Sequence, residues 1–521
     1  MEPLKERLLE YYSWDEEEFA ENTREPSFLR LPSLEGDQGA MLLVRRLLLA
    51  VKNKEKVLIY GDYDTDGILA TSIMVRSLLL LGLKASYFIP SRYRDGYGLN
   101  LENAKKIASG GYSLVLCVDN GVSCLEPVRY LKEKGVDTLI IDHHEFGKEL
   151  PEAIAIVHPL LCGLAKDASF NVSAGFLSYL VSALLLKKND PYLMVLAAVT
   201  TLSDLMPLVG CNREIVRLAL LALEKSPAPE LSALTDSPKI DERTLSMSII
   251  PTINALGRME KEYKARRAVA YFSYREADNR DAYASWMKDV NQSRKERTKA
   301  LVKTVSVTPG ASGICLEVDA LEGLNGLLAN RLMKAYRLPT CVFSSAEKDP
   351  SVLVGSLRSE KGFSVLDCLQ ELSPYCLTSG GHDRAGGLSI RKEDFSSFRK
   401  AFLSYCALHP FVEEKKQGIP LLLSECNEES YAEIRRFAPF GEGHPEPLFV
   451  LTNLSTDSFQ YSKDGKYLIS PLGYGVKMVS FSLGKKDFAQ KEKTSLYARF
   501  RRSYFRNKAG LDIEVAASSN D

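Results

Sequence analysis

A short apolar segment that runs directly into three carboxylates constrains this chain more than any other part of it. Val57–Tyr60 is followed by Gly-Asp-Tyr-Asp-Thr-Asp-Gly, which places Asp62, Asp64 and Asp66 within five residues of one another. A buried strand that ends in three carboxylates is unfavourable, because the charges repel and each costs several kcal/mol when it is desolvated without a partner. A divalent cation would remove that cost, so the segment predicts a metal site at a strand end.

Other acidic and imidazole side chains follow apolar segments in the same way. They are Asp119 after residues 114–118, Asp142-His143-His144 after residues 138–141, and Asp204 after residues 193–202. From residue 56 onward, short apolar segments alternate with helical patterns, which indicates a parallel sheet covered by helices on both faces. Ligands bind outside the carboxyl ends of the strands in such sheets. We therefore expect these side chains to converge on one site.

The residue types favour a hydrolase that uses two hard cations. Oxygen ligands suit Mg²⁺ and Mn²⁺, and imidazole shifts the preference toward Mn²⁺. Five or six such ligands are too many for one ion that also holds water and substrate, whereas two ions roughly 3.5–4 Å apart share a bridging carboxylate and catalyse phosphoryl displacement. The alternative is that these aspartates are helix caps and turn residues, which is a common use of Asp. The additional candidates Asp119, His143 and Asp204 favour the metal site.

Composition limits the cellular context and the partners. The 521 residues are enough for three or more domains, and the formal net charge of zero means that a nucleic-acid partner needs a local basic groove. The first ten residues do not resemble a secretory signal, and no apolar run reaches the length of a membrane span. Ten cysteines occur without a Cys-x-x-Cys pair, which indicates a reducing compartment without disulfides or a zinc knuckle. We expect a cytoplasmic protein.

We expect an α/β protein with a β-rich end and five segments. The expected segments are a helical or irregular N-terminal part (1–40), a catalytic α/β domain (41–215), a helical connector (216–308), a smaller α/β domain (309–408) and a β-barrel-like domain (415–521). Residues 275–304 are rich in charge and predict a long exposed helix. Residues 495–505 and 511–515 predict a hairpin that turns at 507–510.

Basic and glycine-rich segments after residue 250 suggest contacts with phosphate. Arg258 and Arg358 are candidate phosphate clamps, because the planar guanidinium suits that role, although surface salt bridges are the alternative. The glycines on either side of His382 could bring backbone amides close to an anion, or could simply mark turns. Residues 497–508 mix bases with aromatics, as in single-strand binding, but a buried aromatic face on a solvated strand gives the same pattern.

Several motifs together resemble a known family. The first set resembles the four motifs of the DHH phosphoesterase superfamily: Asp62-Tyr-Asp64-Thr-Asp66-Gly, Val118-Asp119-Asn-Gly-Val, Asp142-His143-His144 and Ser203-Asp204. The second set resembles segments of the RecJ family within it: Pro90-Ser-Arg92-Tyr-Arg-Asp-Gly96-Tyr97-Gly98, Pro251-Thr-Ile-Asn254-Ala-Leu-Gly257-Arg258, Gly355-Ser356-Leu-Arg358-Ser359, Gly380-Gly381-His382 and Pro439-Phe-Gly441-Glu-Gly443-His444-Pro445. The motifs keep the family order from about residue 40 to the end.

This resemblance implies a fold and an activity. The fold would be a DHH domain and a DHH-associated domain joined by a long helix, followed by an OB-fold. The activity would be 5′→3′ degradation of single-stranded DNA to 5′-mononucleotides with two Mn²⁺ or Mg²⁺ ions, in DNA repair and recombination. The expected partners are single-stranded DNA, a single-strand-binding protein and a helicase, and the protein is expected to be a monomer without a membrane anchor.

The resemblance also assigns roles to residues. The implied metal ligands are Asp62, Asp64, Asp66, Asp119, His143 and Asp204, with Asp119 bridging the ions and Asp62 either a ligand or a supporting acid. His144 would contact the scissile phosphate, and Tyr97 would line a passage for one strand. The implied DNA-binding residues are Arg92, Tyr97, Arg258, Ser356, Arg358, Gly381 and His382.

Two other functions remain as alternatives. One is a DHH-family enzyme that acts on short oligoribonucleotides, cyclic dinucleotides or polyphosphate, but such enzymes usually lack the OB-fold. The other is a non-catalytic scaffold that binds single strands. The chain departs from the family pattern at Ala385-Gly386-Gly387 and at His444, and neither change removes a candidate ligand.

Overall fold

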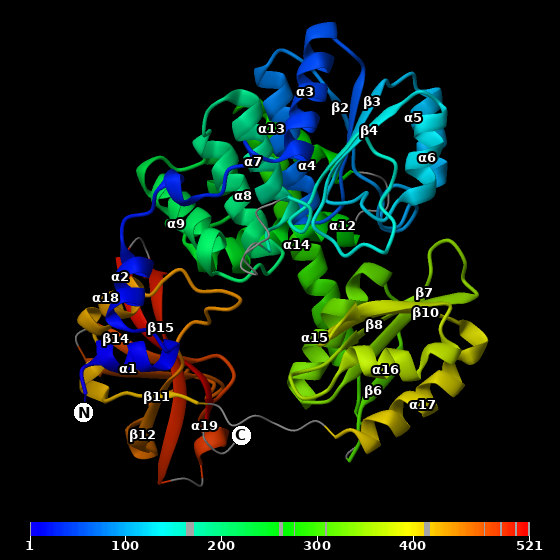
Figure 1. The fold of residues 1–521 in the computed structure, drawn as a ribbon. Coiled ribbons are helices and arrows are strands. Elements are labelled where there is room, and N and C mark those ends of the chain that lie inside the picture. Colours follow the sequence, from blue (N-terminus) through cyan, green and yellow to red (C-terminus); the bar gives the residue numbers. More distant parts are fainter. Residues whose placement is uncertain are drawn as a thin grey trace.

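Three β-sheets organise the part of the chain that the structure describes. The structure is a computed structural model, and it describes residues 2–162, 171–259, 264–275, 277–307, 310–410, 417–473, 475–489, 492–505 and 508–518. Figure 1 shows one body around each sheet, with the first at the top, the second at the lower right and the third at the lower left.

The first sheet is parallel throughout and has the strand order β2-β1-β3-β4-β5. Its strands are β1 (Val57–Tyr60), β2 (Ser86–Phe88), β3 (Leu114–Val118), β4 (Asp137–Ile141) and β5 (Ala155–Val157). The residues of β1 and β3 are all buried, as expected for strands covered on both faces. The predicted parallel sheet is therefore present.

Helices cover both faces of this sheet (Figure 1). One face packs against α3 (Gln38–Asn53), α4 (Thr65–Leu80) and α7 (Ala174–Leu186) in the largest apolar core, and the other against α5 (Leu101–Ser109) and α6 (Leu125–Glu133). The large core continues into further helices, namely α8 (Pro191–Ser203), α9 (Gly210–Lys225), α12 (Ile250–Met259) and α13 (Arg266–Tyr274). Short helices α10 (Pro229–Ser232) and α11 (Glu242–Thr244) and the π-helix η2 (Leu245–Ile249) connect them.

The long helix α14 (Ala277–Thr304) links the first body to the second (Figure 1). The expectation of an exposed helix is only partly met, because Met287 and Thr298 are fully buried and Asn291 is nearly so. Helix α14 packs against α12, α13 and α15, and Arg294 is buried on the same side, where its Nε donates to Asn291 Oδ1 at 2.9 Å. The helix is therefore a packed connector.

The second sheet is mixed and has the order β6-β7-β8-β10-β9. Its strands are β6 (Ile314–Glu317), β7 (Thr340–Ser345), β8 (Val352–Arg358), β9 (Thr378–His382) and β10 (Ala385–Arg391). Helix α15 (Asn325–Tyr336) covers one face, and α16 (Val365–Glu371) and α17 (Phe395–Leu408) cover the other. The second α/β unit is thus confirmed, and together with the first sheet it establishes the α/β class.

The third sheet has six strands in the order β11-β12-β15-β16-β14-β13. Its strands are β11 (Ile419–Pro420), β12 (Phe449–Ser455), β13 (Leu468–Gly473), β14 (Val476–Ser480), β15 (Lys493–Phe505) and β16 (Lys508–Ser518). The predicted hairpin is β15–β16, but residues 508–510, which were expected in its turn, are paired with β15 as part of β16. Asn507 of the expected turn lies outside the described residues. Helices α18 (Glu428–Arg436) and α19 (Lys485–Phe488) complete this body.

The N-terminal helices α1 (Leu4–Tyr12) and α2 (Glu16–Thr23) pack into the core of this third body. Leu8, Leu9 and Phe19 belong to the same apolar cluster as Phe437 and Phe449. Both ends of the chain therefore build one unit, and in Figure 1 both termini lie at the lower left. Local sequence patterns contain no signal for this long-range contact.

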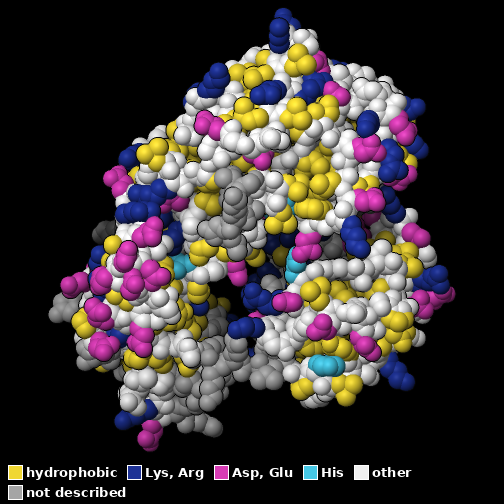
Figure 2. All heavy atoms as spheres, viewed as in Figure 1, with side chains coloured by type: hydrophobic (Ala, Val, Ile, Leu, Met, Phe, Trp, Pro, Cys, Tyr) yellow, Lys and Arg dark blue, Asp and Glu magenta, His cyan; other side chains and the backbone are white. Residues whose placement is uncertain are grey.

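The space-filling view shows a hollow between the three bodies, with Lys and Arg side chains around it (Figure 2). Among the described residues, no helix combines the length and apolarity needed to cross a membrane. All ten cysteines are free thiols.

Candidate metal centre

The candidate ligands gather where the strands of the first sheet end. Asp62 and Asp64 follow β1, Asp119 follows β3, and His143 follows β4. Asp204 joins them from the C-terminal end of α8. Because parallel strands present their carboxyl ends at one edge, segments far apart in sequence meet there.

Three overlapping groups of side chains have the spacing of metal ligands. They are Asp62 with Asp64 and Asp119, then Asp119 with His143 and His144, then Asp66 with His143 and Asp204, and the ligand atoms in each group lie within 4.8 Å of one another. Asp119 and His143 each belong to two groups. This overlap has the form of two neighbouring cation sites that share ligands.

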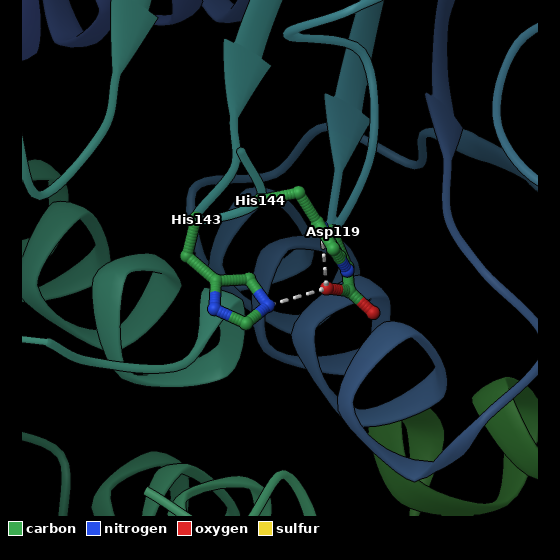
Figure 3. Close-up of side chains that lie close together, drawn as sticks. All are labelled: Asp119, His143 and His144. Carbon is green, nitrogen blue, oxygen red and sulfur yellow. Dashed lines mark ion pairs between the residues drawn. The ribbon is translucent and has the colours of Figure 1, made fainter. Parts of the chain in front are cut away.

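The distances around His143 describe the centre of the site. Its Nε2 lies 3.3 Å from Asp119 Oδ1, 3.4 Å from Asp204 Oδ2 and 3.8 Å from Asp66 Oδ2. Asp119 Oδ1 also lies 3.8 Å from His144 Nδ1, and Figure 3 shows this oxygen facing the rings of both histidines. Carboxylates and imidazole nitrogens point into one small volume.

The buried polar atoms of this volume fit a cation. Asp62 Oδ1, Asp119 Oδ1 and His143 Nε2 are buried and have no hydrogen-bond partner within the described parts of the chain. Such atoms are costly without a partner, and each of them is a suitable ligand for a hard or borderline cation. The donor set therefore fits Mn²⁺ or Mg²⁺.

The pKa values of the site residues also favour a bound cation. Burial, then the neighbouring carboxylates, raises the pKa of Asp62 and Asp119 well above the usual range. The same causes raise the pKa of Asp66 to about 7 and that of Asp204 to about 8. Burial and the charge of His144 lower the pKa of His143 to about 3, so its imidazole is neutral and can ligate. Only a cation would allow all these carboxylates to be charged together.

Asp64 has a structural role as well. Its Oδ1 accepts the amide of Gly67 at 3.0 Å and caps the N-terminus of α4. The capping alternative is therefore correct for one oxygen of this carboxylate, and the same side chain still belongs to the group with Asp62 and Asp119. A cap at the start of α4 also gives the carboxylate a fixed orientation.

Asp66 is oriented by a second helix. Its Oδ2 accepts the amide of Ala174 at 2.9 Å and its Oδ1 accepts that of Gly175 at 2.8 Å. Both amides belong to the first turn of α7, where N–H groups have no partner within the helix. The N-terminus of α7 thus holds this carboxylate in the site.

Asp142, the first residue of the Asp-His-His motif, differs from the candidate ligands because both of its carboxylate oxygens have hydrogen-bond partners within the protein. Its Oδ1 accepts the amides of His143 and His144 and lies 2.8 Å from His144 Nδ1, and its Oδ2 accepts the amide of Val122. Burial opposes its ionisation, but these bonds and the two histidines keep the pKa of Asp142 below its usual range. Both carboxylate oxygens of Asp142 already accept hydrogen bonds, which agrees with the absence of this residue from the predicted set of metal ligands.

His144 is the more exposed of the two histidines, with 40% of its side chain exposed against 7% for His143. Burial opposes its protonation, but the hydrogen bond and charge of Asp142 outweigh burial and raise the pKa of His144 to about 9. The hydroxyl of Tyr97 lies 2.8 Å from His144 Nδ1 and donates to the Asp119 carbonyl at 3.1 Å. Tyr97 therefore lies beside Asp119 and His144, and 51% of its surface is exposed.

Asn120 connects two strand ends of the site, and sequence reasoning missed it. Its Nδ2 lies within hydrogen-bond distance of three carbonyls, those of Tyr60, Gly61 and Val118. Asn120 is fully buried and follows Asp119, whose φ of +61° lies in the left-handed region. The one feature of the sequence that could have predicted this role is that Asn120 directly follows Asp119 in the Val-Asp-Asn-Gly-Val motif.

Helix α12 packs directly on the loop that carries Asp62 and Asp64. The Asn254 side chain accepts the amide of Thr65 at 2.9 Å. A Cβ on Gly257 would lie 2.3 Å from the Tyr63 carbonyl oxygen, so only glycine permits this close approach. Both residues belong to the motif of residues 251–258, but their contacts with residues 63 and 65 are long-range.

The same helix brings Arg258 close to the candidate metal ligands. Burial, then Arg92, lowers the pKa of Arg258 to about 10, and Asp64 opposes this shift. Arg92 lies over the Tyr63 ring at 4.4 Å, and its Nε has no hydrogen-bond partner in the described part of the molecule. With a pKa of about 10, Arg258 remains protonated at neutral pH and provides positive charge beside the carboxylates.

The second body supplies the other predicted DNA-binding residues. Ser356 and Arg358 lie on β8, and a Cβ on Gly326 of α15 would lie 2.8 Å from Arg358 Nη2. Repulsion between Arg92 and Arg358 contributes to a lowered pKa of Arg358, after burial and despite an opposing effect of Cys341. The positive charges of Arg92, Arg258 and Arg358 are therefore close enough to interact electrostatically.

Gly381 and His382 lie further along this sheet, on the exposed edge strand β9. A Cβ on Gly381 would lie 2.3 Å from the Ala385 carbonyl oxygen, which explains the glycine. The structure does not bring these two residues into contact with the metal-ligand groups.

The basic and aromatic residues near the C-terminus are largely neutralised within the chain. Arg501 contacts Glu446 and Glu514, and Arg502 contacts Glu428 at 2.7 Å. Phe500 is buried. Strand β15 lies between β12 and β16, so these residues are on an inner strand of the sheet and not on an edge strand.

This arrangement of acidic and imidazole ligands at parallel strand ends defines a DHH-type phosphoesterase site. The family described as "DHH family, N-terminal domain" matches residues 56–201. The "DHHA1 domain" matches residues 310–408, and the "RecJ OB domain" matches residues 419–517.

Similar proteins narrow the class to one family. The chain is 31% identical over 427 residues to the single-stranded-DNA-specific exonuclease RecJ of Bacillus subtilis (strain 168), covering 78% of this chain and 53% of that protein. It is 30% identical over 457 residues to RecJ of Haemophilus influenzae, covering 79% of this chain and 77% of that protein. The chain belongs to the RecJ family, and it aligns with about half of the first relative and three quarters of the second.

Solved structures agree with this assignment. RecJ of Thermus thermophilus in complex with Mn²⁺ matches with a TM-score of 0.83 at 24% identity, over 99% of this chain and 76% of that one. A second structure, an exonuclease RecJ bound to manganese, matches with a TM-score of 0.62 at 26% identity, over 73% of this chain and 97% of that one. Together with the match of residues 419–517 to the RecJ OB domain, this likeness confirms the expected OB-fold domain.

Proposed function

We propose that this protein is a single-stranded-DNA-specific exonuclease that degrades DNA from the 5′ end and releases 5′-mononucleotides. The observation that carries the proposal is the overlap of ligand groups at Asp119 and His143, beside the arginines of α12 and β8. Membership of the RecJ family supports it. The biological setting would be DNA repair and recombination.

The ligand groups suggest how a two-cation site would be divided. Asp62, Asp64 and Asp119 would hold one ion, and Asp66, His143 and Asp204 the other, with Asp119 between them. Two Mn²⁺ or Mg²⁺ ions bound there would supply an activated water and stabilise the charge on the leaving oxygen. The relatives with bound Mn²⁺ support this choice of metal.

The remaining residues would bind and orient the DNA. His144, half exposed beside Asp119, would contact the scissile phosphate. Arg258, Ser356, Arg358 and His382 would hold the DNA phosphates, including the 5′ end. Arg92 and Gly381 would also bind the DNA. Tyr97 would limit the passage to one strand.

The proposal extends to the setting of the enzyme. We expect a cytoplasmic monomer that works with a single-strand-binding protein and a helicase. The free thiols of all ten cysteines support a reducing compartment. Light scattering coupled to gel filtration measures the oligomeric state, and a dimer would contradict this part.

The experiment that tests the activity uses single-stranded DNA labelled at one end, with Mn²⁺ and then with EDTA. The same DNA with a blocked 5′ end, a blunt duplex and short RNA serve as comparisons. We expect metal-dependent mononucleotide release only from single strands with an open 5′ end. Cleavage of short RNA with intact DNA would favour an oligoribonuclease, and binding without cleavage would favour a scaffold.

A further inference from the structure

A buried histidine outside the predicted site supports the main chain of His144. His158 follows the edge strand β5 and is 1% exposed. Its ring packs edge-on against Phe146 at a centroid distance of 4.9 Å. Phe146 lies in the loop that follows β4 and carries His143 and His144, so this loop wraps around the His158 ring.

Both ring nitrogens of His158 are used by main-chain groups. Nε2 lies 2.9 Å from the carbonyl oxygen of His144, and Nδ1 lies 3.1 Å from the amide nitrogen of Leu160. A carbonyl only accepts and an amide only donates, so the hydrogen must be on Nε2 and the lone pair on Nδ1. The two neighbours thereby select a single neutral tautomer.

Hydrogen bonds of Asp142 hold the start of the loop that follows β4. The amide of Asp142 donates to the Val157 carbonyl at 3.1 Å, which continues the pairing of β4 with β5. Asp142 in turn orients the amide and the ring of His144. His158 holds the carbonyl side of the same residue, so the His144 main chain is fixed from both sides.

We propose that His158 is a positioning residue for the reaction, acting through His144. Its Nε2–H keeps the His144 peptide in place, so that the half-exposed imidazole stays beside Asp119 and faces the DNA. This inference rests on the proposed function, because it assigns His144 to the scissile phosphate. Partners that hold the functional side chains of a metal site in place typically contribute about 10–100-fold to activity.

Two substitutions separate the two hydrogen bonds. In His158→Gln the side-chain amide reaches about as far as Nε2 and can still donate to the His144 carbonyl. In His158→Asn the shorter side chain can accept from Leu160 but does not reach His144. His158→Leu removes both bonds and keeps the bulk, and His409→Gln changes an exposed histidine at the end of α17 in the second body as a control.

We expect kcat for single-stranded DNA to fall by about 10–100-fold in His158→Asn and His158→Leu, and to recover to within about threefold of wild type in His158→Gln. KM for DNA and the affinity for Mn²⁺, measured by calorimetry, should change by less than about threefold, because neither phosphate clamps nor ligands are removed. Equal kcat values for the Gln and Asn variants would overturn the proposal.

A double-mutant cycle distinguishes positioning from a general role in stability. In a His144→Ala background, His158→Asn should lower kcat by less than about twofold, since the group that it positions is already absent. A loss as large as in the wild-type background would show that His158 does not act through His144. If wild-type protein released no nucleotides at all, the proposed function itself would fail, and this outcome is separate from a failed rescue by Gln.

Discussion

At the scale of single residues, Asp119 has the most connected position in the candidate site. It belongs to two ligand groups, contacts both histidines of the motif and lies in the left-handed region at a φ of +61°. Non-glycine residues in this region are uncommon and concentrate at functional sites. Both the backbone conformation and the side-chain contacts of Asp119 therefore indicate a functional role.

The first prediction concerns this carboxylate. Asp119→Asn keeps the backbone conformation, because Asn tolerates the left-handed region, but it removes the charge. We expect cleavage of single-stranded DNA to fall by at least about 100-fold and Mn²⁺ affinity to fall with it. Nucleotide release and calorimetric Mn²⁺ titration measure the two effects, and unchanged Mn²⁺ binding would exclude Asp119 as a bridging ligand.

The second prediction concerns Arg358. This side chain lies on β8, outside the groups of metal ligands, so Arg358→Ala should weaken binding of 5′-phosphorylated single strands by about tenfold through loss of a charge-assisted contact. Mn²⁺ affinity should stay the same. Fluorescence anisotropy with and without the 5′-phosphate, alongside Mn²⁺ titration, tests both statements; loss of metal binding would contradict the separate roles.

At the scale of elements, the sequence located central strands of the first sheet, but not the edge strand β5 or the start of α4. The apolar segments 57–60 and 114–118 were expected to be strands. In the structure they are β1 and β3, with the same first and last residues. Helix α4 starts at Thr65, directly after Asp64, whose side chain caps it. The carboxylate that suggested a metal ligand therefore also caps a helix, and a local pattern does not reveal such a double role.

The third prediction tests the packing of α12 on the metal loop. In Gly257→Ala the new Cβ would lie 2.3 Å from the Tyr63 carbonyl oxygen, so helix or loop must shift. We expect a loss of about 1–3 kcal/mol in the free energy of unfolding, as for other overpacked sites, together with reduced cleavage. Gly36→Ala is the control, because a Cβ there meets nothing within 4 Å; equal stability of both variants would contradict the close approach.

At the scale of the whole molecule, the N-terminal segment joins the first and third bodies. Tyr12 and Trp14 stack on His444, with ring centroids at 4.3 and 4.9 Å. Arg213 of α9 lies over Trp14 and donates to the carbonyls of Phe437, Ala438 and Pro439. This junction fixes the third body relative to the catalytic one.

The fourth prediction follows from burial of His444 at this junction. Burial, then the charge of Arg213, lowers the pKa of His444 to about 4. The unfolded chain, with a pKa of about 6.5, binds the proton more readily, so stability is present above that pH and is lost as pH falls toward 4. Between pH 7 and 5 the loss from this group is about 2 kcal/mol.

Substitution of His444 by asparagine removes the imidazole that titrates. We expect His444→Asn to lose less stability than wild type between pH 7 and 5, as measured by calorimetric unfolding at both values. The same acid-induced loss in both proteins would show that His444 does not contribute to it.

The sequence by itself determined the parallel sheet, the order of the units and the candidate ligands. Strand burial, helix periodicity and strand-end carboxylates are local properties, and the connectivity of a parallel sheet brings its strand ends together without further information. The tertiary structure alone decided which side chains support the ligands. The roles of Asn120, Gly257 and His158 depend on contacts between segments far apart in the chain. The docking of α1 and α2 into the third body depends on such contacts too, since no local pattern encodes the partner of an apolar face.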